Sequence, residues 1–249
     1  MYNKWFYITE KIGNNFFSFD KRKNKQLWVP SLKKINNFNE IQLQEDKEKI
    51  AFEDFDFEDK LSTNYGLKNF YEISPPNSPL EGGNNCPIYL FDNHNHALFF
   101  WYLAKENWLI KQKWNILYHI DEHADYRDPW ITLEKTDLEN IFKYTNFSDI
   151  NVWNYIIPAE KEGLIWKTIQ IRNTMNLENY LENKNKYKNN IILNIDLDFF
   201  QPDLDFIDYD LKKKVILDIA KKASVITIST SPFFINQELA IKVFKYLFN

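Results

Sequence analysis

Short apolar runs of strand length alternate with segments that carry apolar residues at helical spacing throughout residues 86–248. The strand-like runs are PIYLF (87–91), NILYHI (115–120), GLIWKTIQI (163–171), NIILNID (190–196) and SVITIS (224–229). Strands that alternate with helices predict right-handed βαβ units and a mainly parallel sheet. Such sheets bind ligands beyond the carboxyl ends of their strands, so a site is expected there.

Helices are expected between these strands. The segments are HALFFWYLAKENW (96–108), TDLENIF (136–142), INVWNYII (150–157), the first part of 173–190, LKKKVILDIAKKA (211–223) and QELAIKVFKYLF (237–248). Thr136 and Glu139 match a capping box and predict the start of the second helix. Pro158 predicts the end of the third helix.

The first 75 residues lack this alternation. KWFYITE (4–10) and NFFSFD (15–20) are strand-like, and IAFEDFDFEDKL (50–61) predicts an edge strand or an aromatic-anchored loop. SPPNSPLEGGNN (74–85) is the clearest predicted loop. No boundary between domains stands out, so we expect one domain over residues 1–249 that includes the N-terminal part.

Composition excludes several classes of function. Only five glycines occur in 249 residues, and the glycine patterns of dinucleotide-binding and P-loop proteins are missing. A net charge of −4 with interspersed lysines and acids argues against a general nucleic-acid surface. The single cysteine, Cys86, favours a reducing compartment. Without a signal-peptide pattern or a long apolar run, the chain is expected to be soluble and cytoplasmic.

Histidines and aspartates follow three of the predicted strands. They are Asp92, His94 and His96 after 87–91, Asp121, His123 and Asp125 after 115–120, and Asp196 and Asp198 at the end of 190–196. On an extended segment, alternate residues share one face. Like charges on one face repel each other unless a cation lies between them. Histidines with a carboxylate excess suit Mn²⁺, with Fe²⁺ or Zn²⁺ as alternatives.

Each cluster also has a simpler interpretation. A lone Asp-x-Asp at the end of a strand is more often a solvated or capping pair. His119 lies inside a predicted strand, and we interpret it as a core histidine whose hydrogen bonds are satisfied. Three clusters at equivalent strand ends nevertheless favour a metal site over three separate coincidences.

Four of these segments together resemble a known superfamily. FDNHNHALFFW, HIDEHADYRDP, NIDLDFFQP and ITISTSPFFINQ are similar to segments of the arginase/ureohydrolase fold, which histone deacetylases share. In detail they look more like a smaller arginase-like group that includes the peptide arginases of ribosomal peptide natural-product pathways. The resemblance covers about residues 86–240. It implies a three-layer fold with helices on both faces of the sheet.

The resemblance also implies a site with two Mn²⁺ ions. His94, Asp121, Asp125 and Asp196 would hold one ion, and His123, Asp121, Asp196 and Asp198 would hold the other. Asp121 and Asp196 would bridge the two ions. His94 is preferred to His96 because it keeps the family's spacing to Ala97 and Leu98. His96 is then a candidate proton carrier.

The chain departs from the arginase pattern in three places. FDNHN replaces the usual Gly-Gly-Asp-His-Ser, and Gln201 stands at the third acidic position of the usual Asp-x-Asp-x-x-Asp-Pro. No histidine remains for the proton-shuttle loop of arginases that act on free arginine. These changes concern proton transfer and the free amino-acid pocket, whereas the metal ligands are all present.

The resemblance implies a peptide arginase that converts arginine in a precursor peptide to ornithine and urea. Guanidinium is a poor electrophile, and two metals can lower the pKa of an attacking water. Asp125 would relay a proton to the leaving amine. Glu238 or Glu122 would hold the cationic substrate, and Gln237 and Asn236 would line the pocket. Alternatives are a single-Zn²⁺ deacetylase-like amidohydrolase and a catalytically silent peptide-binding module.

Overall fold

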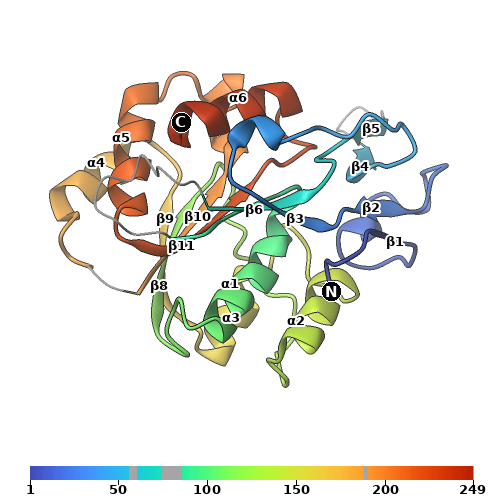
Figure 1. Cartoon of the computed structure of the whole chain (residues 1–249), viewed down its shortest axis with the longest axis horizontal. Helices are drawn as coiled ribbons and strands as arrows, with labels where there is room; N and C mark the ends of the chain where they lie inside the picture. The colour runs from blue at the N-terminus through green and yellow to red at the C-terminus, as the bar shows by residue number, and fades with distance from the viewer. Residues whose placement is uncertain (56–60, 75–85, 188–189, 249) are drawn as a thin grey trace.

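The computed structural model describes residues 1–55, 61–74, 86–187 and 190–248. Its centre is a seven-stranded sheet with the order β3-β6-β7-β11-β10-β8-β9 (Figure 1). The strands are β3 (Leu32–Ile35), β6 (Phe70–Ile73), β7 (Ile88–Phe91), β8 (Asn115–Ile120), β9 (Ile165–Ile171), β10 (Ile191–Asp196) and β11 (Ala223–Ser229). Every neighbouring pair is parallel except β6 and β7. The prediction of an α/β fold with a mainly parallel sheet is therefore confirmed.

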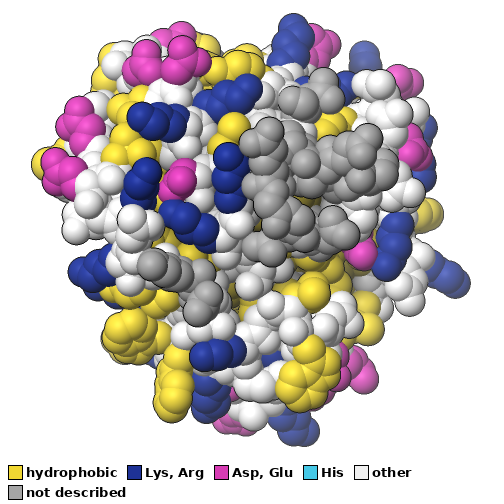
Figure 2. Space-filling view, turned by 60° about the vertical axis from the view of Figure 1, so that its left-hand side comes forward, with side chains coloured by type: hydrophobic (Ala, Val, Ile, Leu, Met, Phe, Trp, Pro, Cys, Tyr) yellow, Lys and Arg dark blue, Asp and Glu magenta, His cyan; other side chains and the backbone are white. Residues whose placement is uncertain are grey.

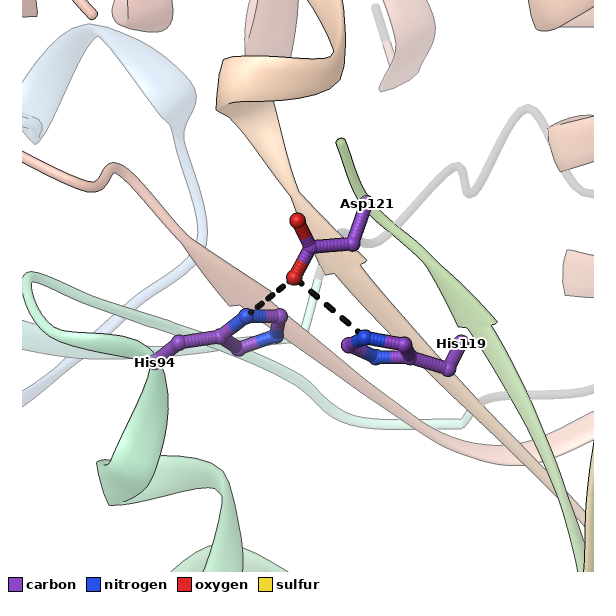
Figure 3. Close-up of side chains that lie close together, drawn as sticks. All are labelled: His94, His119 and Asp121. Carbon is purple, nitrogen blue, oxygen red and sulfur yellow. Dashed lines mark ion pairs between the residues drawn. The ribbon is translucent and has the colours of Figure 1, made fainter. Parts of the chain in front are cut away.

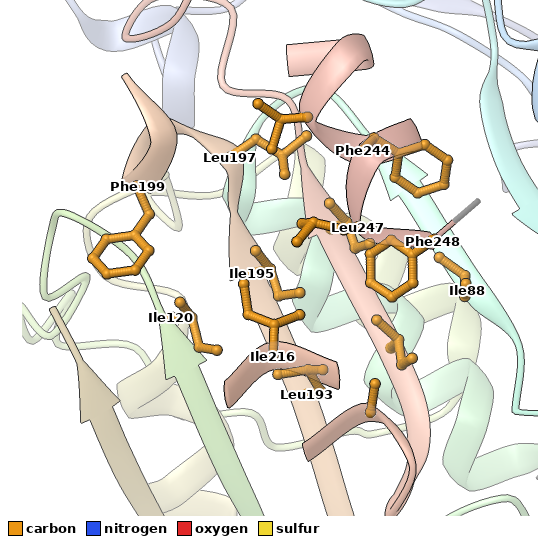
Figure 4. Packing of buried hydrophobic residues seen from close by; sticks show 14 of the residues in the cluster. Ile88, Ile120, Leu193, Ile195, Leu197, Phe199, Ile216, Phe244, Leu247 and Phe248 are labelled. Atoms are coloured by element: carbon orange, nitrogen blue, oxygen red, sulfur yellow. The ribbon is translucent and has the colours of Figure 1, made fainter. Parts of the chain in front are cut away.

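Helices cover both faces of this sheet (Figure 1). They are α1 (Ala97–Glu106), α2 (Leu138–Asn146), α3 (Ile156–Glu162), α4 (Thr174–Asn183), α5 (Tyr209–Ala220) and α6 (Gln237–Phe248). Alternate side chains of a strand point to opposite faces, so Ile120 packs with α5 and α6 while Leu117 packs with α1 and α3. Figure 4 shows the first of these cores, where Leu193 and Ile195 lie near Ile216 of α5.

Two helix boundaries differ from the prediction. Helix α2 begins after Asp137, whose side chain accepts a hydrogen bond from the backbone N–H of Asn140. Asp137, and not Thr136, is therefore the cap of α2. Helix α3 (Ile156–Glu162) shares only two residues with the helix predicted at 150–157, because residues 150–155 form turns and irregular backbone. Pro158 lies in the first turn of α3 and does not end it. A proline is tolerated there because the first N–H groups of a helix have no partner within the helix.

The N-terminal part adds strands β3 and β6 to the central sheet and also forms two antiparallel pairs. One pair joins β1 (Phe6–Ile8) to β2 (Leu27–Val29), and the other joins β4 (Phe52–Phe55) to β5 (Leu61–Asn64). Of the two alternatives for 50–61, an edge strand or an aromatic-anchored loop, the structure shows a strand at Phe52–Phe55, and residues 56–60 lie outside the described residues. The strand predicted at 15–20 was wrong, because a 3-10 helix covers Gly13–Phe16 and turns follow it. Residues 75–85 of the predicted loop lie outside the described residues.

The topology brings several strand ends together. β7, β11, β10 and β8 are neighbours in that order and run parallel. Their carboxyl ends therefore meet at one edge of the sheet. Short 3-10 helices follow two of them, η3 (His94–His96) after β7 and η4 (Leu197–Phe200) after β10. In the part of the chain that the structure describes, no helix has the length and apolar character needed to cross a membrane.

Candidate metal centre

The six predicted metal ligands lie together at this edge of the sheet. His94 begins η3, Asp196 ends β10 and Asp198 lies in η4. The other three ligands, Asp121, His123 and Asp125, follow β8. All are buried except His123, which is partly exposed. The structure thus joins residues that are up to 104 positions apart, since His94 and Asp198 define the span.

Tight turns, rather than extended strands, orient the side chains of the predicted ligands. The backbone N–H of His123 donates to the Asp121 carboxylate. In the same way, the N–H of Asp198 donates to Asp196 Oδ1 at 3.0 Å, so Asp196 caps η4. Short acidic side chains form such turns readily. The prediction that alternation along a strand would align the ligands was therefore wrong, although the ligands do converge.

The first cluster surrounds His94. Its Nδ1 atom lies 3.0 Å from Asp121 Oδ2, 3.1 Å from Asp125 Oδ2 and 3.2 Å from Asp196 Oδ2. Asp125 adopts φ 49°, in the left-handed region. Non-glycine residues in this region carry backbone strain of about 1–3 kcal/mol and gather at functional sites. The strain supports a functional role for the placement of this carboxylate.

The second cluster surrounds His123. Its Nδ1 atom lies 2.9 Å from Asp198 Oδ2 and 3.5 Å from Asp121 Oδ1, and the ring of Phe234 lies beside it at 4.6 Å between centroids. Asp121 consequently directs one oxygen to His94 and the other to His123.

The electrostatics of the site call for additional positive charge. Burial and the neighbouring charge of Asp121 raise the pKa of Asp125 to about 7. Burial and the charges of Asp196 and Asp121 likewise raise the pKa of Asp198 well above its usual value. Burial also opposes ionisation of Asp121, but the neighbouring imidazoles of His123 and His94 hold its pKa well below the usual range. The four carboxylates of Asp121, Asp125, Asp196 and Asp198 thus share only the imidazoles of His94 and His123 as ion-pair partners within the two clusters.

Unsatisfied atoms show that cations fit this site. Both ring nitrogens of His94 and Oδ2 of Asp121 are buried without a hydrogen-bond partner in the described part of the chain. The contacts of His94 Nδ1 with the carboxylates are short enough for ion pairs, but they lack hydrogen-bond geometry. Buried polar atoms without partners are costly unless a ligand takes them up. A donor set of carboxylates and imidazoles suits Mn²⁺, Fe²⁺ or Zn²⁺.

His119 is also part of this site. Its Nε2 atom lies 3.3 Å from Asp121 Oδ2, and Figure 3 shows its ring beside that of His94. Together His94, His119 and Asp121 form a group close enough to hold a metal ion, as do Asp121, His123 and Asp198. The sequence interpretation of His119 as a core histidine missed this contact. The available signal was its spacing of two residues from Asp121, which can place both on one face.

Two serine hydroxyls brace Asp196 and were also missed. Ser229 Oγ donates to Asp196 Oδ2 at 3.3 Å, and Ser231 Oγ donates to the same oxygen. Ser231 adopts φ 41°, a second left-handed residue at the site. Both serines come from the end of β11 and the turn after it, where the sequence shows no ionisable residue. Hydroxyl donors of this kind orient a carboxylate that binds metal.

Asp92 and His96 lie outside both clusters. Asp92 Oδ1 accepts a hydrogen bond from the N–H of Leu67 at 2.6 Å, and burial raises its pKa to about 7. The Nδ1 atom of His96 lies 2.7 Å from the hydroxyl of Tyr2, and its ring packs against Phe70. Burial lowers the pKa of His96 to about 3. The described contacts of His96 do not connect it with the predicted metal ligands.

Of the four residues proposed to bind substrate, Glu122 lies nearest the clusters. Its N–H donates to Asp198 Oδ1 at 3.4 Å, and its carboxylate accepts a hydrogen bond from Gln201. It is partly buried, and burial raises its pKa. Glu238, in contrast, is exposed in the first turn of α6.

The other two residues hold the start of α6. Asn236 accepts a hydrogen bond from the N–H of Leu239 at 3.0 Å and so caps the helix. The side chain of Gln237 is buried and donates to the carbonyl of Thr230 at 2.7 Å. Its Oε1 atom has no partner among the described residues. These contacts give both residues a structural role at the end of β11.

A cavity of about 270 Å³ lies between β9 and α4 and is separate from the clusters. Tyr180, Tyr187, Lys167 and Lys186 are among its lining residues, and none of the predicted ligands is. Lysine and arginine side chains gather on the face of the molecule seen in Figure 2. None of the candidate metal ligands therefore faces this cavity. No protein-family model and no curated protein matches the chain.

Proposed function

We propose that this protein is a metal-dependent hydrolase with a three-layer arginase-like fold that converts peptide-bound arginine to ornithine and urea. One observation carries the proposal: six ligands predicted from three strand ends converge in two clusters that share Asp121. The helices on both faces of the parallel sheet fit the proposed fold. Peptide rather than free arginine is proposed from the sequence resemblance.

The ligands divide between two Mn²⁺ ions. His94, Asp121, Asp125 and Asp196 would hold one ion, and His123, Asp121, Asp196 and Asp198 would hold the other. The two oxygens of Asp121, which face different histidines, support its bridging role. The majority of carboxylates favours Mn²⁺ over Zn²⁺ or Fe²⁺. Bound cations would supply Lewis acidity that lowers the pKa of water toward neutrality.

The protein's own groups would bind the substrate and move protons. Asp125, which contacts His94 through Oδ2, is proposed to accept a proton from the attacking water and to relay it to the leaving amine. A carboxylate would hold the cationic guanidinium. Glu122 is the better candidate because it is partly buried beside Asp198, whereas Glu238 is exposed.

The decisive experiment incubates the Mn²⁺-loaded protein with an arginine-containing peptide and, separately, with free arginine. Mass spectrometry follows the change from arginine to ornithine, and a urea assay confirms it. Conversion of the peptide alone supports a peptide arginase, and conversion of both supports a general ureohydrolase. No conversion with two metals bound would contradict the proposal. Deacylation of an acyl-lysine peptide with one Zn²⁺ bound would replace it with a deacetylase-like activity.

A further inference from the structure

A chain of buried polar groups runs from helix α1 through the sheet to the metal centre. It joins Trp101 of α1, Thr227 of β11, Asn194 of β10, His119 of β8 and finally Asp121. All five side chains are fully buried. Buried polar groups need hydrogen-bond partners, so the donors and acceptors along this chain must alternate consistently.

The Trp101 end sets the direction of the chain. An indole N–H can only donate, and Trp101 Nε1 donates to Thr227 Oγ1 at 3.1 Å. The hydroxyl of Thr227 then donates in turn. It lies 2.8 Å from Asn194 Oδ1 and 3.4 Å from the carbonyl of Leu193, so the shorter bond is to Asn194. The amide oxygen of Asn194 therefore faces Thr227.

This direction fixes the protonation of His119. The NH₂ group of Asn194 faces His119 Nδ1 at 3.0 Å and the hydroxyl of Tyr155 at 2.9 Å. His119 Nδ1 must then accept a hydrogen bond. The neutral ring carries its hydrogen on the other nitrogen, Nε2, which lies 3.3 Å from Asp121 Oδ2 (Figure 3). This contact is short enough for an ion pair but, like those of His94 Nδ1, it lacks hydrogen-bond geometry.

We propose that His119 is a positioning residue that keeps the Nε2–H edge of its ring facing Asp121 and does not bind metal itself. Proximity alone would place His119 in a metal-binding group with His94 and Asp121. A nitrogen that carries a hydrogen has no lone pair for a metal. An N–H group beside a carboxylate that two cations share orients that carboxylate for metal binding. The inference rests on the metal-binding part of the proposed function and is independent of the reaction.

The direct test is nitrogen NMR of the histidine rings. The chain has only four histidines, so the signals can be assigned with single substitutions. We expect the Nε2–H form of His119 in the metal-free protein and in the protein loaded with Cd²⁺, with no coupling between ¹¹³Cd and His119. An Nδ1–H ring, or coupling between ¹¹³Cd and Nε2, would overturn the inference. Absence of urea formation would contradict only the proposed function.

A variant test acts far from the metal. Thr227→Val removes the hydroxyl that orients Asn194, so the tautomer of His119 is no longer fixed. We expect the affinity for Mn²⁺, measured by calorimetry, to decrease by about 10-fold, the lower end of the range for loss of an outer partner. Thr227→Ser keeps the hydroxyl and should keep the affinity.

Thr230→Val is the matched control. Thr230 is equally buried just after β11, and its Oγ1 atom has no partner among the described residues. This variant should bind Mn²⁺ like the unchanged protein. Equal affinities for Thr227→Val and Thr230→Val, with an unchanged His119 tautomer, would contradict the inference. The NMR measurement on the unchanged protein remains decisive if the valine variant fails to fold.

Discussion

Asp196 illustrates how a single carboxylate can serve both clusters. Its Oδ2 atom faces His94 and accepts hydrogen bonds from two serines, while Oδ1 caps η4 and so positions Asp198. Asp196→Asn removes the charge without changing the shape of the side chain. We expect Mn²⁺ affinity to fall by more than about 100-fold, the upper limit for an outer partner, together with loss of turnover. Calorimetry and the urea assay measure both.

The matched control for this change is Asp203→Asn. Asp203 is exposed in the short 3-10 helix η5 (Pro202–Leu204) that follows η4, so its substitution should leave metal binding unaltered. Full activity of Asp196→Asn would refute the proposed site. A similar loss in both variants would show that the effect is not specific to the cluster.

Glu122 allows the substrate part of the proposal to be tested at the residue scale. Glu122→Gln removes the carboxylate proposed to hold the guanidinium but keeps a partner for Gln201. We expect KM for the peptide to rise by roughly 10-fold or more, because a hydrogen bond to a charged group contributes about 1.5–3 kcal/mol. The metal content should stay the same. Glu238→Gln is the control, and a rise in KM for that variant alone would transfer the role to Glu238.

Residue identities at strand ends were predictable because spacing and ionisable side chains are visible in the sequence. The role of His119 was not, since it depends on Asn194, which lies 75 residues further along the chain and on a neighbouring strand. Ser229 and Ser231 escaped notice for a similar reason. Neutral hydroxyl groups acquire a role only through the carboxylate that they face.

At the scale of elements, the N-terminal part holds the turn that carries His94. Asn93 donates to the carbonyl of Ala51 at 3.0 Å, Asn14 donates to Asn95 at 2.8 Å, and Tyr2 contacts His96. The residues on both sides of His94 are thus tied to segments that the sequence resemblance does not cover. This part of the chain therefore supports the candidate metal ligand His94 as well as the sheet.

Asn14→Ala tests this support. It leaves the side-chain oxygen of Asn95 without its donor and the backbone N–H of Val152 without its acceptor. Each loss costs about 1–3 kcal/mol of stability, and the first loosens the turn around His94. We expect a several-fold decrease in affinity for one of the two metals. Asn154→Ala is the control because Asn154 is also buried and hydrogen-bonded, but to Asn151 and Asp149. If both variants lose the same stability and bind metal equally well, the hydrogen bond from Asn14 to Asn95 does not support the metal ligand His94.

The elements differed in how well they could be predicted. Strands β8 and β10 are buried throughout, and their apolar runs made them clear in the sequence. Strands β3 and β6 have four residues each and carry polar side chains, and their pairing with the sheet is long-range. Pro158 misled the prediction of α3 because one residue type is compatible with both a helix start and the position after a helix end.

At the scale of the whole molecule, two apolar cores stabilise the sheet while its carboxyl edge gathers buried charge. Burial raises the pKa values of Asp92 and Asp125 to about 7. In the unfolded chain such groups ionise near pH 4. Between about pH 4 and 7 the folded, metal-free protein therefore binds more protons than the unfolded chain, and its stability falls as the pH rises. The site thus opposes folding most strongly when its carboxylates are ionised.

Metal binding should offset the loss of stability that the ionised buried carboxylates cause, and this stabilisation should be larger at higher pH. Cations require ionised carboxylates and neutral imidazoles, so protons compete with them below about pH 7 at Asp125. The pKa of His123, which its contacts with Asp121 and Asp198 raise to about 11 against the effect of burial, adds a dependence of the same sign.

We expect Mn²⁺ at 100 times its Kd to raise Tm by roughly 5–10 °C. The increase should be larger at pH 8 than at pH 6 at equal Mn²⁺ concentration, and EDTA should abolish it. Thermal melts of the unchanged protein and of Asp196→Asn give the comparison, and an increase of equal size in the variant would show that the cations stabilise the protein elsewhere.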